Sequence, residues 1–134
     1  MLEAAARPIG GLCARVLRFN DGSLERLLLR HAVGEDVSGF QLAPGAHGVM
    51  MIPIPHAGVY RGVVGLEEAR RVPGVEDIII TAKEGQQVLP LPEGSTYLGF
   101  LFFRGPTADE VVKGLREAHR RLQFLLPTAL PVVK

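Results

Sequence analysis

The chain has 134 residues, which suits one domain with a modest hydrophobic core. Its 15 Lys and Arg residues nearly balance its 14 Asp and Glu residues, so charge gives no indication of a nucleic acid, membrane or polyanionic partner. The only cysteine, Cys13, excludes an internal disulfide and any metal site that needs several cysteines. There is no signal-peptide pattern at the N-terminus and no apolar run near the roughly 20 residues of a bilayer span, so we expect a cytoplasmic protein.

Two helices are predicted in the first 34 residues. Residues 12–17 follow a Gly-Gly pair and allow about two helical turns before the turn-forming residues 20–22. Ser23 is the predicted N-cap of the second helix, which Gly34 ends. Residues 35–46 have no hydrophobic period and contain two glycines and a proline, so we predict a long loop. The apolar side of the second helix is formed by Leu24, Leu27 and Leu28, with His31 at the same spacing.

Strand signals dominate from residue 47 onward. The continuous apolar run 48–52 predicts a strand that is buried on both faces. Three successive isoleucines at 78–80 are a strong strand signal, because β-branched side chains favour extended backbone. The predicted elements in chain order are strands at 48–52 and 58–64, a helix at 66–71, a strand at 76–82, a short extended piece at 88–91 and a strand at 96–104.

The final predicted helix begins at Thr107. Thr107 and Glu110 have the spacing of a capping box, in which each side chain satisfies a free backbone N–H of the first turn. Pro127 ends this helix, and we predict a loose tail after it. The fold class is therefore α+β: two N-terminal helices, then β-β-α-β-β-α, a mixed or antiparallel sheet with helices packed on one face. The apolar stripe of the final helix is Val111, Val112, Leu115, Ala118, Leu122 and Leu125.

The densest group of chemically useful residues lies at the start of the chain, at Glu3, Arg7, Gly10 and Gly11. A carboxylate can hold a magnesium ion, and a guanidinium can clamp phosphate oxygens with two parallel hydrogen bonds. Backbone N–H groups after the Gly-Gly turn offer a further anion site at a helix N-terminus. These groups suit substrates that are phosphates or carboxylates, but on spacing alone a solvated Glu/Arg pair before a turn is the simpler explanation.

The same stretch resembles the last catalytic motif of the ATP-grasp ligases, Glu-x-Asn-x-Arg-x-x-Gly. Glu3, Arg7 and Gly10 match the motif position by position, whereas Ala5 replaces the usual asparagine. The resemblance implies that Glu3 binds magnesium and that Arg7 contacts phosphate or an acyl-phosphate intermediate. It also implies that one magnesium ligand is missing at Ala5 or comes from elsewhere. The turn at Gly10 and Gly11 would then approach the substrate carboxylate.

The resemblance continues through nearly the whole chain, as far as residue 126. The later segments look like the C-terminal region of the L-amino-acid ligases, and the glycine-threonine step into the last helix is similar to the end of biotin carboxylase. The implied division is the end of an ATP-grasp catalytic domain at 1–34, a loop at 35–46, a C-terminal α+β domain at 47–126 and a tail at 127–134. The segments that carry the resemblance are Gly11–Arg15, Ser23–Gly34, His47–Pro53, Pro73–Glu76, Gly85–Val88 and Leu98–Glu110.

Two functions from different classes follow. In the first, the chain is the C-terminal portion of an ATP-grasp ligase that forms an amide or peptide bond through an acyl phosphate. ATP, Mg²⁺ and an amino-acid-like substrate then bind to the intact ligase. Because the resemblance places the ATP-binding lobes before the motif, we expect this chain alone to be inactive, to bind neither cofactor tightly, and to need an upstream ATP-grasp polypeptide as partner.

In the second function, the chain is a stand-alone, non-catalytic assembly domain. It forms a homo-oligomer or binds a partner protein, because apolar surface that would face the missing lobes tends to be covered. An independent small-molecule enzyme is disfavoured, since no acid/base pair or nucleophile stands out. The apolar surface in question comprises Leu12, Val16, Leu17, Leu24 and Leu28.

The remaining polar residues favour structural roles. The basic pairs at 70–71 and 120–121 lack the interleaved aromatic residues that stack bases, so we expect them to be solvated. No two histidines have zinc-site spacing. The four are His31 and His119, expected at the rim of apolar stripes, His56, expected at an exposed turn, and His47.

Overall fold

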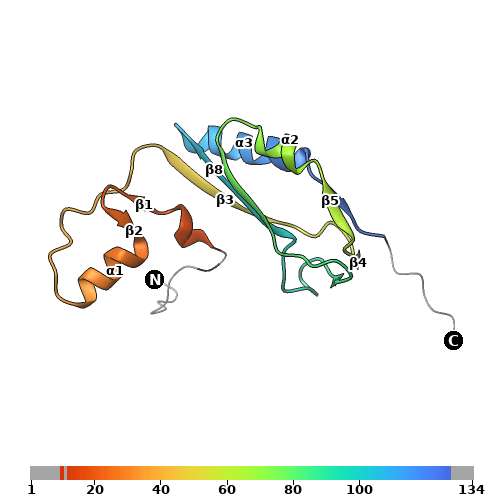
Figure 1. The fold of residues 1–134 in the computed structure, drawn as a ribbon, viewed down its shortest axis with the longest axis horizontal. Helices are drawn as coiled ribbons and strands as arrows, with labels where there is room; N and C mark the ends of the chain where they lie inside the picture. The colour runs from red at the N-terminus through yellow and green to blue at the C-terminus, as the bar shows by residue number, and fades with distance from the viewer. Residues whose placement is uncertain (1–9, 11, 128–134) are drawn as a thin grey trace.

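The structure is a computed structural model that describes residue 10 and residues 12–127 (Figure 1). No helix in this part of the chain has the length and hydrophobicity needed to cross a bilayer. In chain order the elements are the 3-10 helix η1 (Cys13–Val16), strands β1 (Arg18–Phe19) and β2 (Gly22–Ser23), helix α1 (Leu24–Ala32), strands β3 (Ala46–Ile52), β4 (Gly58–Val59) and β5 (Gly62–Val64), helix α2 (Leu66–Arg70), strands β6 (Val75–Ile80), β7 (Gln87–Val88) and β8 (Gly99–Gly105), helix α3 (Ala108–Arg120) and strand β9 (Gln123–Leu125).

An antiparallel three-stranded sheet, in the order β3-β8-β6, forms the centre of the fold. All of β8 pairs with β3 without interruption, from Gly105 opposite Ala46 to Gly99 opposite Ile52. β6 pairs with the other side of β8 and has an irregularity at Glu76. The strand with three phenylalanines, β8, is the central one, because a central strand has both edges covered and can bury the most apolar surface.

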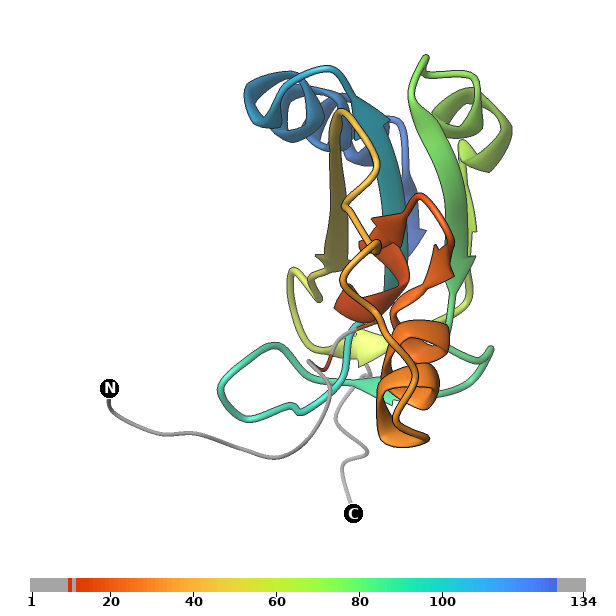
Figure 2. The ribbon, with the colours of Figure 1, turned by 90° about the vertical axis from the view of Figure 1, so that its left-hand side faces the viewer.

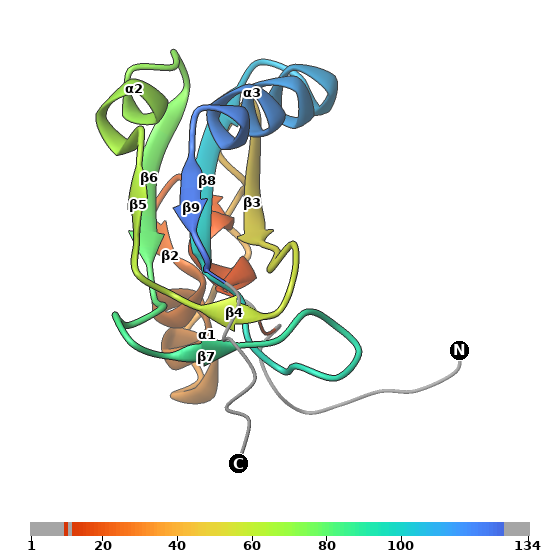
Figure 3. The ribbon, with the colours of Figure 1, turned by 90° about the vertical axis from the view of Figure 1, so that its right-hand side faces the viewer.

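Helices α2 and α3 cover one face of this sheet, with α3 over β3 and β8 and α2 next to β6 (Figure 3). Leu101 and Phe103, two residues apart on β8, belong to this core. The α+β class and the packing of helices on one face of the sheet are therefore confirmed. The buried residues of the core are Ile52, Ile54, Tyr60, Ala69, Val72, Ile78, Val88, Leu98, Leu101, Phe103, Val111, Leu115, Ala118, Leu122 and Leu126.

Two glycines allow α3 to lie close to the sheet. A Cβ added to Gly48 on β3 would come within 2.6 Å of Val111 Cγ1 on the helix. A Cβ added to Gly114 on α3 would overlap the ring of Phe103 on β8. The helix and the sheet therefore interlock only because each side lacks a side chain at its point of closest approach.

The helix starts predicted at Ser23 and Thr107 are confirmed, but the Glu110 carboxylate accepts from the Thr107 hydroxyl, where a capping box would have it accept from the Thr107 N–H. The Thr107 hydroxyl accepts a hydrogen bond from the Glu110 N–H at 3.3 Å and donates one to the Glu110 carboxylate at 2.9 Å. The Ser23 hydroxyl accepts from the Arg26 N–H at 3.3 Å and caps α1 in the same way. Gly34 follows the end of α1 with a left-handed φ of 81°, a conformation that glycine adopts without strain.

Several predicted boundaries differ from the structure. The predicted strand 58–64 is split into β4 and β5, because the two halves pair with different partners, β7 and β9. The predicted helix at 12–17 is only the four-residue η1. The final helix ends at Arg120 and not near Pro127, because the chain turns there so that β9 can pair with β5.

Three burial predictions are wrong for a geometric reason. Val112 is 45% exposed, since it lies about 100° around the helix from the buried Val111. Leu125 is 43% exposed because it lies on β9 and not on the helix. Met51 is 37% exposed, so β3 is not buried on both faces: α2 and α3 cover only one, and we call the opposite one the second face.

Replacing Gly114 with alanine tests the interlocking of α3 with β8. Gly→Ala within a helix normally stabilises by about 1 kcal/mol. Here we expect Gly114→Ala to lower the free energy of unfolding by about 1–3 kcal/mol, because the new Cβ overlaps the Phe103 ring. Urea denaturation measures the change. Phe103→Leu is the paired control: adding it to Gly114→Ala should recover part of the loss, and a stabilised Gly114→Ala single variant would contradict the packing described.

The pH dependence of stability tests the burial of His119 on α3. Desolvation lowers the pKa of His119 below its usual value. The unfolded chain therefore takes up this proton at a higher pH than the folded chain, so stability falls as the pH drops through the ordinary histidine range. We expect the loss of unfolding free energy between about pH 7.5 and about pH 5.5 to be smaller in His119→Gln. Urea denaturation at several pH values measures the difference, and an unchanged pH dependence in His119→Gln would contradict the burial of this histidine.

Candidate functional site

Most of the predicted catalytic group lies outside the described residues: this holds for Glu3, Ala5, Arg7 and Gly11. Gly10 is described and is exposed in a turn, where its carbonyl oxygen accepts a hydrogen bond from the Cys13 N–H at 3.2 Å. A Cβ at Gly10 would meet nothing within 4 Å. Packing within this part of the chain therefore gives no reason for a glycine at position 10.

Leu12 turns the chain directly after Gly10. Its φ of 58° is left-handed, which is uncommon for a residue other than glycine, and it stands at the N-cap of η1. η1 then lies against β3 on the second face of the sheet (Figure 2). The segment that follows the predicted catalytic motif thus packs against the central sheet and does not extend away from it.

Arg15 on η1 makes two contacts with the sheet. Its guanidinium lies 4.4 Å from the centroid of the Phe102 ring, and its Nη2 donates to Asp77 Oδ2 at 2.8 Å. Phe102 on β8 is only 2% exposed although it faces away from α2 and α3. An arginine can stack on a ring and pair with a carboxylate at the same time because its guanidinium is planar. Arg15 therefore covers the second face where Phe102 would otherwise meet water.

Glu76 joins two further residues to this contact. Its Oε2 lies 3.9 Å from Arg18 Nη2 and 3.8 Å from His47 Nδ1. The His47 side chain is 10% exposed, and neither ring nitrogen has a hydrogen-bond partner among the described residues. The irregularity in β6 at Glu76 places two successive carboxylates, Glu76 and Asp77, beside two arginines. We call Arg15, Arg18, His47, Glu76 and Asp77 the charged cluster.

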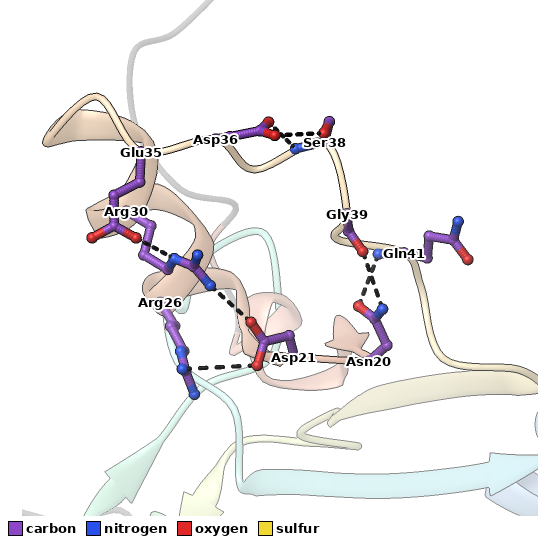
Figure 4. A network of polar contacts seen from close by, with 9 residues as sticks. All are labelled: Asn20, Asp21, Arg26, Arg30, Glu35, Asp36, Ser38, Gly39 and Gln41. Atoms are coloured by element: carbon purple, nitrogen blue, oxygen red, sulfur yellow. Dashed lines mark hydrogen bonds and ion pairs between the residues drawn. The ribbon is translucent and has the colours of Figure 1, made fainter.

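The loop after α1 is fixed by polar contacts and folds back on the turn before α1 (Figure 4). Asn20 donates to the Gly39 carbonyl at 3.1 Å and accepts from the Gln41 N–H at 3.0 Å. Arg30 bridges Asp21, at 2.8 Å, and Glu35. The hydrogen bond with Glu35 is the main reason that the pKa of Arg30 is raised above its usual value. Polar bonds hold this region because it buries little apolar surface.

The apolar side of α1 is left open. None of the helix's nine residues is buried, and Leu28 is 43% exposed. Leu12 in the preceding segment is also 43% exposed. In Figure 1, α1 with β1 and β2 lies beyond the end of the sheet, away from α2 and α3. The N-terminal elements therefore expose apolar surface that the C-terminal domain does not cover.

Two hollows lie next to the charged cluster. One, of about 740 Å³, lies between η1, β1 and the start of α1. Here the pKa of Glu25 is lowered, chiefly by a hydrogen bond from Ser23. The other, of about 490 Å³, lies where β3 and β6 begin and β8 ends. The residues that line the first are Ala14, Arg15, Leu17, Arg18, Phe19, Gly22, Ser23 and Glu25.

The charged cluster is the part of the site that sequence reasoning missed. Arg15 and Arg18 are three residues apart in the sequence, but nothing in their spacing indicates partners at Glu76 and Asp77, some 60 residues later. In the described part of the chain, no three His, Cys, Asp or Glu residues are placed to hold a metal ion together. The cluster is therefore a structural contact that supports the segment after Gly10, and on its own it offers no nucleophile or metal centre.

The fold is an α+β domain in which η1 packs on the second face of the central sheet. A family model described as L-amino acid ligase C-terminal domain 2 matches residues 50–126, which is more than half of the chain. The chain therefore belongs to the L-amino acid ligase C-terminal domain 2 family, and the predicted resemblance is confirmed.

Two solved structures have a similar fold. The L-amino acid ligase from Bacillus licheniformis is 24% identical with a TM-score of 0.66, and the match covers 79% of this chain and 27% of that one. The N5-carboxyaminoimidazole ribonucleotide synthetase from Thermotoga maritima is 13% identical with a TM-score of 0.56, covering 88% and 31%. The chain thus spans less than a third of the proteins it resembles. No curated protein matches its sequence.

Substitution of Arg15 tests whether it holds η1 on the sheet. Arg15→Ala removes a ring contact and an exposed ion pair, together about 1 kcal/mol. We expect the amides of Arg15 and Leu17, which bond within η1, to exchange hydrogen several-fold faster, while the amides of β8 keep their protection. Arg18→Ala, whose ion pair is longer, should have a smaller effect. Unchanged exchange in Arg15→Ala would show that η1 is held by something else.

Proposed function

We propose that this chain is the C-terminal portion of an ATP-grasp ligase that joins a carboxylate and an amine through an acyl phosphate. The observation that carries the proposal is the family match over residues 50–126, which lies downstream of a stretch, residues 3–10, with the Glu, Arg and Gly of the last catalytic motif. Contacts at Arg15 and Arg18 support it, because they give the segment after Gly10 a fixed attachment to the domain.

In this proposal the motif residues take separate roles. Glu3 holds Mg²⁺, Arg7 steadies phosphate and the acyl-phosphate intermediate, and the turn at Gly10 and Gly11 approaches the substrate carboxylate. An arginine suits this role because its planar fork binds two oxygens of a phosphate at once. Gly10 supports the assignment in one respect: its position is exposed and its packing would tolerate a side chain, so a glycine there fits approach by a ligand.

We propose that the binding site for ATP and Mg²⁺ is not complete within the described residues. In support, no three of their His, Cys, Asp and Glu side chains are grouped to hold a metal ion, and the first two described arginines, Arg15 and Arg18, are paired with Asp77 and Glu76. In the intact ligase, the cofactors would supply the phosphoryl group and the charge that offsets its transfer. We propose that both bind mainly to an upstream ATP-grasp polypeptide in the cytoplasm, and that this chain alone is inactive.

A second candidate function rests on the exposed side of α1. With Leu12 and Leu28 each 43% exposed and no buried residue on the helix, this surface has the character of an interface. The chain would then be a non-catalytic assembly domain. The same surface is also what a ligase lobe would cover, so reconstitution of activity discriminates between the two functions.

The test is reconstitution with the ATP-binding region of an L-amino-acid ligase, supplied as a separate polypeptide with ATP, Mg²⁺ and amino acids. We expect no phosphate release from this chain alone and amino-acid-dependent release from the mixture. Arg7→Ala should lower that release at least 100-fold, since removing one catalytic charge contact costs about 3 kcal/mol. Arg26→Ala on α1 is the matched arginine control and should keep the activity. If no ligase region restores turnover, the ligase proposal fails.

A further inference from the structure

Strand β3 leaves one edge of the central sheet open. Its partner is β8 on one side, and the described residues place no strand on its other side. Figures 2 and 3 both show β3 as the outermost strand of the sheet on that side, next to α3. At an open edge, alternate N–H and C=O groups point outward and are free to pair with another strand.

The sequence of β3 does nothing to block such pairing. Its seven residues, Ala46–Ile52, contain no lysine, arginine, aspartate, glutamate or proline, and its ladder with β8 has no bulge. Natural proteins usually protect an edge with lysine, proline, a bulge or a short strand. The opposite edge strand, β6, carries such features, because it contains Glu76, Asp77 and an irregularity at Glu76. The two edges of one sheet therefore differ in a way that singles out β3 for association.

The flank of α3 beside this edge is also open and partly apolar. Val111, Leu115 and Ala118 face the sheet, while Arg121 on the opposite flank reaches the Glu68 carbonyl of α2. Helical periodicity therefore turns Ala108, Val112 and Arg116 toward the β3 side. Val112 is 45% exposed there. A partner that only added a strand to β3 would leave Val112 uncovered.

We propose that two copies of this chain pair through their β3 strands, antiparallel and centred near Val49, to form one continuous sheet. The distance between the two α3 helices in such a dimer is suitable, because each α3 lies over both β3 and β8 of its own copy. With adjacent strands about 4.8 Å apart, the two α3 helices are brought to about 10 Å, the ordinary distance between packed helices. A second copy thus covers the strand edge and Val112 together.

Charge on α3 matches the same arrangement. The pairing runs the two α3 helices antiparallel, so the first turn of one lies beside the second half of the other. Asp109 stands in that first turn and Arg116 in the second half, and neither has an ion-pair partner among the described residues. Opposite charges therefore meet, and the two helix dipoles oppose each other favourably. The proposal concerns assembly alone and does not depend on the ligase proposal.

Sedimentation velocity of the full chain over a range of concentrations tests the dimer. We expect a dimer whose dissociation constant rises at least ten-fold in Val112→Glu. Val64→Glu is the matched control, because Val64 is also an exposed valine, at 52%, but lies on β5. It should dimerise like the wild type. A monomer at every concentration, or a dimer weakened as much by Val64→Glu as by Val112→Glu, overturns the proposal.

Cross-linking tests the pairing of the strands directly. In a Cys13→Ser background, Val49→Cys provides a single cysteine at the centre of β3. In the proposed dimer, this cysteine faces the same cysteine of the second copy across the two-fold axis. Opposed residues of antiparallel strands have Cβ atoms about 4.5–5.5 Å apart, near enough for a disulfide after a small shift. We expect mild oxidation to give a covalent dimer, whereas Val64→Cys, exposed on β5, gives at least ten-fold less. Equal yields would overturn the pairing, and circular dichroism confirms that each variant is folded.

Discussion

The ring of Phe103 lies between two glycines, Gly74 in the turn after α2 and Gly114 in the middle of α3. A Cβ at Gly74 would come within 2.5 Å of the ring, and one at Gly114 would overlap it. Through this one side chain, the central strand, the α2–β6 turn and α3 fix one another's positions. Because a packed interior has no spare volume, the rest of the C-terminal domain depends on these three elements meeting at this distance.

The opposite face of β8 has a different chemistry and a different role. Phe103 is covered by helices, whereas its neighbour Phe102 is covered by the guanidinium of Arg15. An arginine can cover a ring with its side chain while its charge stays near water. The contact of Arg15 with Phe102 therefore suits the second face of the sheet, which is only partly buried. It joins the chain just after Gly10 to the sheet. The segment that follows the proposed catalytic motif is thus attached to the central sheet.

Periodicity and capping rules were sufficient to predict where most of the helices and strands lie in the sequence. Ser23 and Thr107 begin helices as predicted, and the isoleucines at 78–80 lie in a strand. These features depend on residues a few positions apart, which a sequence displays directly. The errors arose where distant pairing decided the outcome: β9 forms only because β5 is available to it, and this shortened the final helix at Arg120. Among the predicted site residues Glu3, Arg7, Gly10 and Gly11, the structure describes only Gly10. The roles of Glu3 and Arg7 therefore stay predictions.

By itself the sequence determined the class of fold, the helix starts and the family resemblance, because each of these is written in local patterns or in an ordered series of short segments. Tertiary structure alone decided which strand became central, which face of the sheet the helices cover, and that Arg15 meets both Phe102 and Asp77. It also decided that β3 has a strand on only one side among the described residues, while the opposite edge strand, β6, contains Glu76 and Asp77. The physical reason is that these outcomes depend on contacts between residues far apart in the chain, whose energies are fixed only when the whole sheet has assembled.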